Sequence, residues 1–276
     1  NDTLTFFYPA GLFTKEPDRA LRVAVDMASG TAEEYDSADE KAGQYWFTGF
    51  ETVVGGPLDD TLAGDGGGTY LVGGSGDDTM SSTKSATDAR DTLEGGAGAD
   101  TLSGNGTLAN LSYAGSPEAV SVDIANDEAS GGDADGDVIS AFFLLTGSAH
   151  DDTLTAGAAS SLTGLAGSDV FAFDAPKTFD SIVGITDFEA GVDKVDVRPL
   201  MVTGFDQITI GANIVGFGDP DGLRIAMDTT DLAADDFIFA TKVSGTGRGS
   251  AEPDWLVGGR DEDTLYGLGE RDHLYG

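Results

Sequence analysis

Cysteine is absent from this sequence, histidine occurs twice, and 14 basic residues stand against 49 acidic ones. The lack of cysteine excludes disulfides, thiolate metal sites and a cysteine nucleophile. The shortage of Lys and Arg, with a net charge of -35, argues against nucleic acid and anionic membrane surfaces as partners, because both attract clustered basic residues. No apolar run approaches the ~18 residues of a membrane-spanning helix. So much negative charge repels itself unless cations neutralise it.

Glycine, by contrast, is abundant. The 41 Gly with only 8 Pro indicate many tight turns rather than a disordered, proline-rich chain. Hydrophobic residues make up 39% of the sequence, which is enough for a core. The 276 residues leave room for about two ordinary domains or one long repetitive one.

A nine-residue pattern recurs along the chain, with Gly in the first position, Asp in the sixth and an apolar residue in the eighth. The cleanest copies are GGSGDDTMS at 73–81 and GGAGADTLS at 95–103. A copy lengthened by four residues lies between them, and copies with more departures occur at 55–63, 64–72, 104–112, 147–155, 164–172 and again after residue 252. A fixed short period of this kind is typical of a solenoid.

Each repeat predicts a turn followed by a short strand. Glycines permit the positive φ values that tight turns need, and the Thr-Leu segment after each Asp has the alternation of a strand. Two repeats then make one coil, with the eighth residue pointing inward. We expect an all-β fold of parallel β-roll or β-solenoid segments, interrupted by β inserts and a β-rich closing unit. The expected inward residues are Leu62, Leu71, Met80, Leu93 and Leu102.

The sixth-position aspartates predict a metal site. Asp60 and Asp78 are eighteen residues apart, so they lie on the same edge of successive coils, and Asp100 follows once the lengthened repeat is allowed for. Coils stack about 4.8 Å apart, where two carboxylates repel by several kcal/mol at an effective dielectric constant of about 20. A dication between them reverses the sign of that energy. Ca²⁺ suits paired Asp and turn carbonyls because it takes roughly six to eight oxygens in flexible geometry, whereas Mg²⁺ dehydrates reluctantly.

These repeats resemble the glycine-rich nonapeptides of the RTX (repeats-in-toxin) family. The resemblance implies that each calcium ion is held by the sixth-position Asp of two stacked turns and by backbone carbonyls of the glycine positions. Carried over to this chain, it selects the side chains of Asp60, Asp78 and Asp100. The implied carbonyl ligands are those around Gly73, Ser75, Gly95 and Ala97.

Other turns depart from the pattern, since Leu58 and His150 stand where the fourth-position Gly belongs. An Asp that only caps its turn through Asx hydrogen bonds is the alternative throughout. At 131–137, GGDADGD either holds an ion or is a solvated acidic turn. The remaining predicted ligands are Asp91 on the opposite edge, Asp152 with Asp169, Asp254 with Asp272, Asp263 on the other edge of the last repeats, and Asp133, Asp135 and Asp137.

A second kind of unit occurs twice between the repeats. VAVDMASGTAEE at 23–34 matches VSVDIANDEASG at 120–131, and each predicts strands that leave the roll and return through Phe50 or Phe142. The aromatic-rich stretch after the second roll resembles the closing unit of serralysin-type RTX proteins, which covers the open end of a solenoid. The predicted segments are an insert at 1–54, a roll at 55–112, an insert at 113–146, a roll at 147–172, the closing unit at 173–240, and a linker with a further roll at 241–276.

We expect no enzyme. No His-Glu-x-x-His zinc helix is present, and the two histidines, His150 and His273, fall in unrelated repeat turns. Acidic residues are so common that a carboxylate pair for glycoside hydrolysis carries little weight. Trp255, Tyr266 and Tyr275 occupy outward positions of the last roll, where they either contact another chain or pack on neighbouring strands.

The sequence predicts an extracellular, calcium-stabilised structural segment of a larger secreted surface or matrix protein, of adhesin, filament or S-layer type. The alternative is the non-catalytic C-terminal region of a secreted RTX enzyme, where the roll assists export and folding. The resemblance implies secretion by a type I system. Partial repeats stand at both ends, NDTLT at 1–5 and LYG at 274–276, so end-to-end contact with neighbouring modules or further copies is expected.

Overall fold

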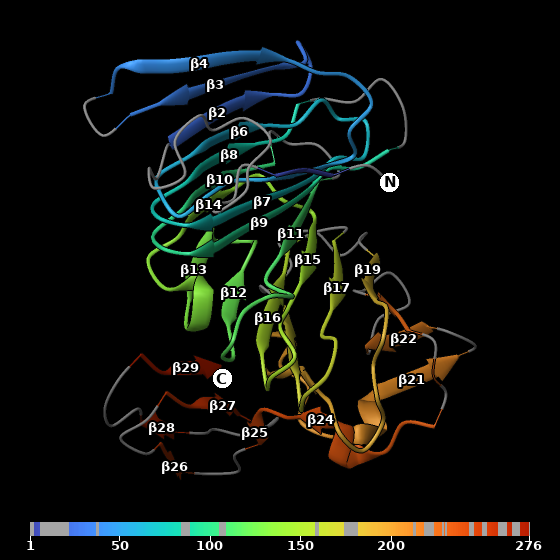
Figure 1. Cartoon of the computed structure of the whole chain (residues 1–276). Helices are drawn as coiled ribbons and strands as arrows, with labels where there is room; N and C mark the ends of the chain where they lie inside the picture. Colours follow the sequence, from blue (N-terminus) through green and yellow to red (C-terminus); the bar gives the residue numbers. More distant parts are fainter. Residues whose placement is uncertain are drawn as a thin grey trace.

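In the computed structural model, short strands and tight turns form a two-sided solenoid (Figure 1). No α-helix occurs in the described part of the chain, and so no helix there could cross a membrane. The predicted all-β fold with parallel β-roll segments is confirmed. The structure describes residues 3–5, 22–36, 39–83, 89–104, 109–157, 160–173, 182–211, 214–217, 224–227, 229, 231–242, 246–249, 253–258, 264–266 and 271–275.

An eleven-stranded sheet, called the long sheet below, runs along one side of the solenoid. Up to β23 each strand pairs in parallel with the strand one coil further on, and the sheet ends in antiparallel pairs with β22 and β21. In sheet order the strands are β1 (Thr3–Thr5), β5 (Thr52–Val54), β7 (Tyr70–Ser75), β9 (Thr92–Ala97), β11 (Asn110–Ser112), β15 (Leu144–Thr146), β17 (Ser161–Thr163), β19 (Ile182–Ile185), β23 (Arg224–Ala226), β22 (Ile214–Phe217) and β21 (Ile208–Gly211).

The opposite side of the solenoid is divided into two sheets. The seven-stranded sheet consists of β14 (Val138–Ser140), β10 (Thr101–Ser103), β8 (Thr79–Ser81), β6 (Thr61–Ala63), β2 (Arg22–Asp26), β3 (Thr31–Tyr35) and β4 (Lys41–Trp46). The six-stranded sheet consists of β13 (Glu128–Ser130), β12 (Ser121–Asp123), β16 (Thr153–Ala156), β18 (Val170–Phe173), β20 (Lys194–Asp196) and β24 (Phe237–Ile238). Four 3₁₀ turns complete the described elements: η1 (Gly132–Ala134), η2 (Arg198–Leu200), η3 (Phe205–Gln207) and η4 (Ala234–Asp236).

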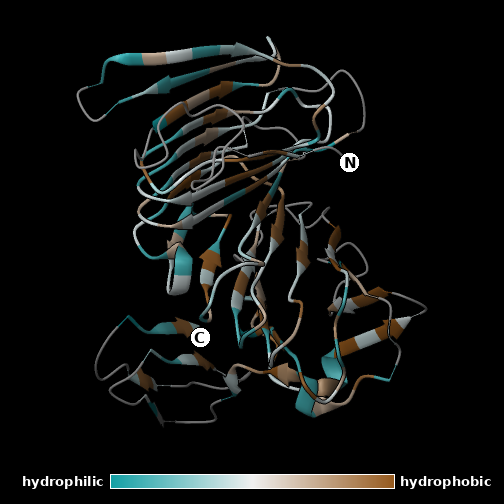
Figure 2. Cartoon of the chain, viewed as in Figure 1, coloured by the Kyte–Doolittle hydropathy of each residue, from teal (hydrophilic) through white to brown (hydrophobic). Residues whose placement is uncertain are grey.

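The core lies between the two sides and is built from the eighth residues of the repeats. In the seven-stranded sheet Leu62, Met80 and Leu102 stand in register on successive strands, and Leu71 and Leu93 face them from the long sheet. All five are buried, as predicted. Each such side chain contributes about 1.5–3 kcal/mol of hydrophobic free energy. Figure 2 shows the apolar residues concentrated in the strands and the polar ones in the turns.

The two inserts share one structure. In each, a hairpin of two antiparallel strands (β2–β3 and β12–β13) adds its first strand in parallel to the strand of a nonapeptide, β6 or β16. Asp26 and Asp123 close the hairpin turns by accepting the N–H of Ala28 and of Ala125. The sequence predicted that the strands of each insert leave the roll. This prediction is wrong for the first strand of each insert, β2 and β12. They remain in the roll because their apolar faces complete its core.

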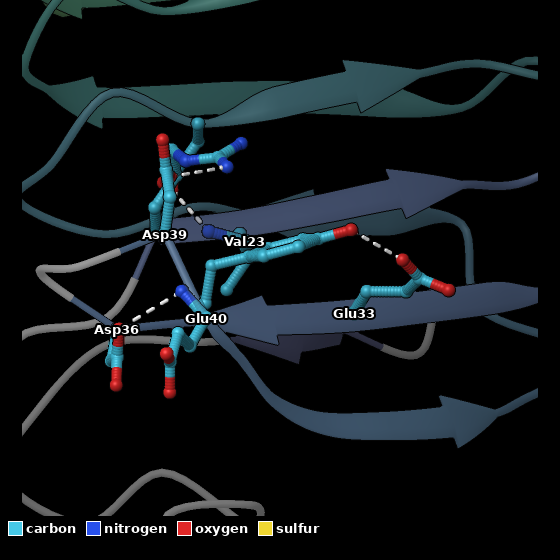
Figure 3. A network of polar contacts seen from close by, with 8 residues as sticks. Val23, Glu33, Asp36, Asp39 and Glu40 are labelled. Carbon is cyan, nitrogen blue, oxygen red and sulfur yellow. Dashed lines mark hydrogen bonds and ion pairs between the residues drawn. The ribbon is translucent and has the colours of Figure 1, made fainter.

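Polar contacts stabilise the first insert at the connection between β3 and β4 (Figure 3). Arg22 pairs with Asp39 at 2.8 Å and lies over the ring of Tyr35 at 4.5 Å from its centroid. The N–H of Glu40 donates to Oδ1 of Asp36 at 3.0 Å. Asp36 therefore accepts a hydrogen bond within this connection, and Asp39 forms an ion pair with Arg22.

The long sheet is continuous across several of the predicted segment boundaries. β11 pairs with β15, β15 with β17, and β17 with β19, so the second insert and the start of the closing unit belong to the same sheet as both rolls. The predicted boundaries therefore do not coincide with breaks in this sheet.

The last described strands begin a separate roll with the same parallel pairing. β25 (Thr241–Lys242), β27 (Trp255–Val257) and β29 (His273–Tyr275) form one sheet, and β26 (Thr246–Arg248) and β28 (Thr264–Tyr266) form the other. The ring of Trp255 stacks on that of His273, with centroids 3.8 Å apart. Trp255 and Tyr275 therefore pack on neighbouring strands, which was one of the two interpretations of their positions. Tyr266 lies beside Arg248 and is 45% exposed.

Candidate metal centre

One aspartate per coil lies along an edge of the seven-stranded sheet. The N–H of Asp60 donates to Oδ1 of Asp78 at 2.7 Å. The N–H of Asp78 donates to Asp100, and that of Asp100 to Asp137, each at 2.8 Å. These four residues are called the first ladder. The predicted placement of Asp60, Asp78 and Asp100 on one edge is what the structure has, and the fourth rung comes from the second insert.

A second ladder follows on the six-stranded sheet. The N–H of Asp152 donates to Oδ1 of Asp169 at 2.9 Å, and that of Asp169 to Oδ1 of Asp193 at 3.0 Å. Asp193 was not predicted. Its turn has a glycine at residue 191 but lacks one in the first position, so the nine-residue pattern is weak there.

Both ladders start in the same way. The N–H of Val23 donates to Oδ1 of Asp60 at 2.7 Å, and the N–H of Val120 donates to Oδ1 of Asp152 at 2.8 Å. Because Val23 and Val120 are matching residues of the two inserts, each insert supplies the first donor of one ladder. The duplicated insert sequence therefore has a duplicated structural role.

Burial perturbs the carboxylates of Asp60, Asp78, Asp100 and Asp169. Asp78 is 1% exposed and Asp100 is 0% exposed. Burial raises the pKa of Asp78 to about 8, and the nearby charges of Asp60 and Asp100 also raise it. Burial likewise raises the pKa values of Asp60, Asp100 and Asp169 to about 6. A cation beside these groups would favour their charged forms and lower the pKa values again.

Two oxygens in the first ladder lack partners. Oδ2 of Asp78 and Oδ2 of Asp100 are buried and accept no hydrogen bond. A Cβ atom on Gly73 would lie 2.2 Å from Oδ2 of Asp78 and 2.5 Å from the carbonyl oxygen of Gly95. The carboxylate of one coil and a carbonyl of the next therefore face each other across a space that only glycine leaves open. Hard oxygens in this arrangement fit Ca²⁺.

The predicted carbonyl ligands stack on one another. Gly74 lies opposite Gly96 and Ser75 opposite Ala97 where β7 pairs with β9. The carbonyl of Ala97 accepts the N–H of Gly76 at 3.0 Å, which leaves its second lone pair available. In the described residues no three carboxylate or imidazole side chains gather around one point. An ion here would therefore draw on one or two aspartates and complete its shell with carbonyls and water.

Asp91, on the opposite edge, is surrounded by donors from the preceding turn and by Ser82 of its own repeat. Its oxygens accept the N–H groups of Gly66, Gly68 and Thr69 at 2.9, 3.2 and 2.9 Å and the hydroxyl of Ser82 at 2.8 Å. Both oxygens are engaged, so the geometry favours turn capping over metal binding at Asp91.

The structure separates the three predicted ligands of the loop at 131–137. Asp137 is buried in the first ladder and accepts the hydroxyl of Tyr113 at 2.8 Å. The backbone N–H of Asp133 donates to Oγ of Ser116 at 3.0 Å, and Asp135 is exposed. The hydroxyl of Tyr113 was not foreseen, because no spacing in the sequence links it to Asp137.

The last repeats begin a further ladder of the same kind. The N–H of Asp254 donates to Oδ1 of Asp272 at 3.1 Å, and the N–H of His273 donates to the carbonyl of Asp254 at 2.7 Å. The predicted ligand Asp263 lies outside the described residues.

A family model described as the RTX calcium-binding nonapeptide repeat (4 copies) matches residues 47–82, 85–106 and 248–276. The match includes the turns of Asp60, Asp78 and Asp100, while the second ladder lies outside it. No curated protein matches the chain. The likeness of the closing unit to serralysin-type proteins stays a prediction. The buried carboxylates, the facing carbonyls and the family match agree, and the chain carries the calcium-binding nonapeptide repeats of the RTX family.

Proposed function

We propose that this chain is a calcium-dependent structural segment of a secreted or cell-surface protein, in which Ca²⁺ joins stacked turns and makes the solenoid rigid. The observation that supports it most is the pair of buried, unpartnered Oδ2 atoms of Asp78 and Asp100. A buried acceptor without a partner costs about 1–3 kcal/mol, and more when it is charged. A Ca²⁺ ion bound to either oxygen removes that cost. Because the ion contacts two coils, its binding is coupled to the folding of both coils.

The proposed role is extracellular and non-catalytic. Carbonyl-rich sites of extracellular modules bind Ca²⁺ with dissociation constants of about 10⁻⁴–10⁻³ M, an affinity that loads them where calcium is millimolar. The net charge of -35 destabilises the compact state by self-repulsion until cations bind. The chain would therefore fold only after it reaches the millimolar calcium outside the cell.

Within this role, the continuous long sheet supports a module of an extended surface protein of adhesin, filament or S-layer type. Stacked coils in which each repeat contacts only its neighbours form a stiff rod. End-to-end self-association of copies is part of this proposal. Light scattering at several calcium concentrations tests it, and a chain that stays monomeric in millimolar calcium would contradict the assembly.

Calcium-dependent folding is tested by circular dichroism and thermal melting. In chelator we expect reduced β content and a low melting temperature, and in millimolar Ca²⁺ a cooperative gain in both. Mg²⁺ at the same concentration serves as the matched control and should give a smaller effect, because it dehydrates reluctantly. A β content and melting temperature unchanged by calcium would refute the proposed function.

A further inference from the structure

Six aspartate-bearing turns of the two ladders occur in two conformations. In the open turns, 73–78, 95–100 and 164–169, the second and fourth residues both have positive φ. The left-handed conformation turns the N–H of the second residue away from the aspartate of its own turn. The six φ values are 119° at Gly74, 113° at Gly76, 97° at Gly96, 152° at Gly98, 78° at Leu165 and 141° at Gly167.

In the closed turns, 55–60, 147–152 and 188–193, the second residue has no positive φ, and its N–H points into the turn. The N–H of Gly56 donates to Oδ2 of Asp60 at 2.6 Å. The equivalent bonds run from Ser148 to Asp152 at 2.5 Å and from Glu189 to Asp193 at 2.7 Å.

The sequence explains which turns are closed. Leu58 and His150 occupy the fourth position of two of them, and Glu189 occupies the second position of the third. Side chains there disfavour the left-handed region that the open turn requires at both positions. Glycine at both positions, as in 73–78 and 95–100, permits it.

The two conformations leave the carboxylates in different states. In the open turns Oδ2 of Asp78 and Oδ2 of Asp100 are buried without a partner. No hydrogen bond to Oδ2 of Asp169 is found among the described residues, but this oxygen is not one of the fully buried unpartnered ones. In the closed turns a main-chain N–H already supplies the positive charge density that an ion would bring.

We infer that the conformation of the second residue decides whether a turn takes calcium. Closed turns replace the ion by their own N–H, so Asp60, Asp152 and Asp193 are structural anchors that need no metal. Open turns require the ion, which places a calcium-binding turn at 164–169, outside the region that the family model matches. The inference rests on the proposed calcium-dependent role and refines it to single turns.

Leu165 supports the inference independently. A leucine is held at φ 78° although the residue is 46% exposed. The N–H groups of Gly164 and Leu165 donate to the carboxylate of Asp187 at 3.0 and 2.8 Å. Asp187, from the next coil, therefore holds this turn open where glycine is missing.

Matched pairs of variants test the inference, each pair taking one closed and one open turn from the same ladder. The pairs are Asp60→Asn with Asp78→Asn, and Asp152→Asn with Asp169→Asn. Melting temperatures are measured in chelator and in millimolar Ca²⁺, and bound calcium is counted by equilibrium dialysis.

Closed-turn variants should lower the melting temperature equally in both conditions and leave the calcium count unchanged, because they lose an N–H bond and no ion. Open-turn variants should keep or raise the melting temperature in chelator, lower it in calcium and reduce the calcium count. If Asp152→Asn fails to fold, Ser148→Ala tests the same turn, since it removes the hydroxyl bond to Oδ1 of Asp152 at 2.8 Å and should leave the calcium count intact.

Loss of bound calcium in Asp60→Asn and Asp152→Asn, or an unchanged count in Asp78→Asn and Asp169→Asn, would overturn the inference. A wild-type chain without any response to calcium would instead refute the proposed function. The two failures are therefore distinguishable.

Discussion

At the scale of the residue, Asp78 concentrates the electrostatic cost of the fold. It stands in the middle of the first ladder between Asp60 and Asp100, and burial raises its pKa to about 8. Without an ion, the folded chain must keep this side chain protonated or bury an unpaired charge. With an ion, the same carboxylate becomes a ligand. Asp78 thus couples calcium binding and proton binding to the stability of the folded chain.

The raised pKa values predict that the calcium-free protein is more stable in mild acid. The folded-state pKa values of Asp60, Asp78 and Asp100 exceed the ordinary value of about 3.9, so the folded state binds more protons than the unfolded chain. Their contribution is full below pH ~4 and is lost as the pH rises through about 6 and then about 8. Melting temperatures of metal-stripped protein should therefore fall between pH 5 and pH 8.

Asp78→Asn is the control for this pH profile, because it removes the group with the highest of these pKa values and should flatten the profile near pH 7. Saturating calcium should have a similar effect on the wild type. A metal-stripped chain whose melting temperature rises from pH 5 to pH 8 would contradict the assignment of buried, ion-free carboxylates.

The nine-residue spacing predicts where the Asp residues of the clean repeats lie in the ladder. It fails where the chain departs from this period. Asp60, Asp78 and Asp100 could be placed on one edge by counting residues. Asp137 could not, because its position opposite Asp100 depends on how a long insert folds back onto the roll. Asp193 was missed because its turn lacks the first glycine.

At the scale of the element, the turn is the unit that carries function. In each turn, the φ values of the second and fourth residues decide whether Oδ2 of the sixth-position Asp accepts an N–H or remains unpartnered. The strands were predictable, since the eighth residue of each repeat is apolar and buried. The inserts were less so, because the parallel pairing of β2 with β6 joins segments far apart in sequence.

Leu165→Gly should stabilise the chain. Glycine relieves about 1–2 kcal/mol of left-handed strain against about 0.5–1 kcal/mol of added chain entropy in the unfolded state. The net gain of about 1 kcal/mol corresponds to a melting temperature higher by about 3 °C. Leu165→Ala is the matched control: it keeps Cβ and should give no such gain. Equal melting temperatures for the two variants would show that residue 165 is not strained.

At the scale of the whole molecule, one long sheet joins two ladders that differ in their need for metal. The first ladder has consecutive open turns at 73–78 and 95–100, whereas in the second ladder one open turn at 164–169 lies between closed ones. Chelation should therefore weaken the first roll more than the second. The sequence could predict the solenoid and its ion. The different calcium needs of the two ladders also depend on Leu165, whose left-handed conformation its residue type does not predict.

The most direct test is a crystal structure of the calcium-loaded chain, with the ions located by their anomalous scattering. We predict a calcium ion between the turns 73–78 and 95–100, about 2.3–2.6 Å from Oδ2 of Asp78 and from the carbonyl oxygen of Gly95. No ion at this point, with Oδ2 of Asp78 accepting the N–H of Gly74 instead, would contradict the calcium-bound ladder.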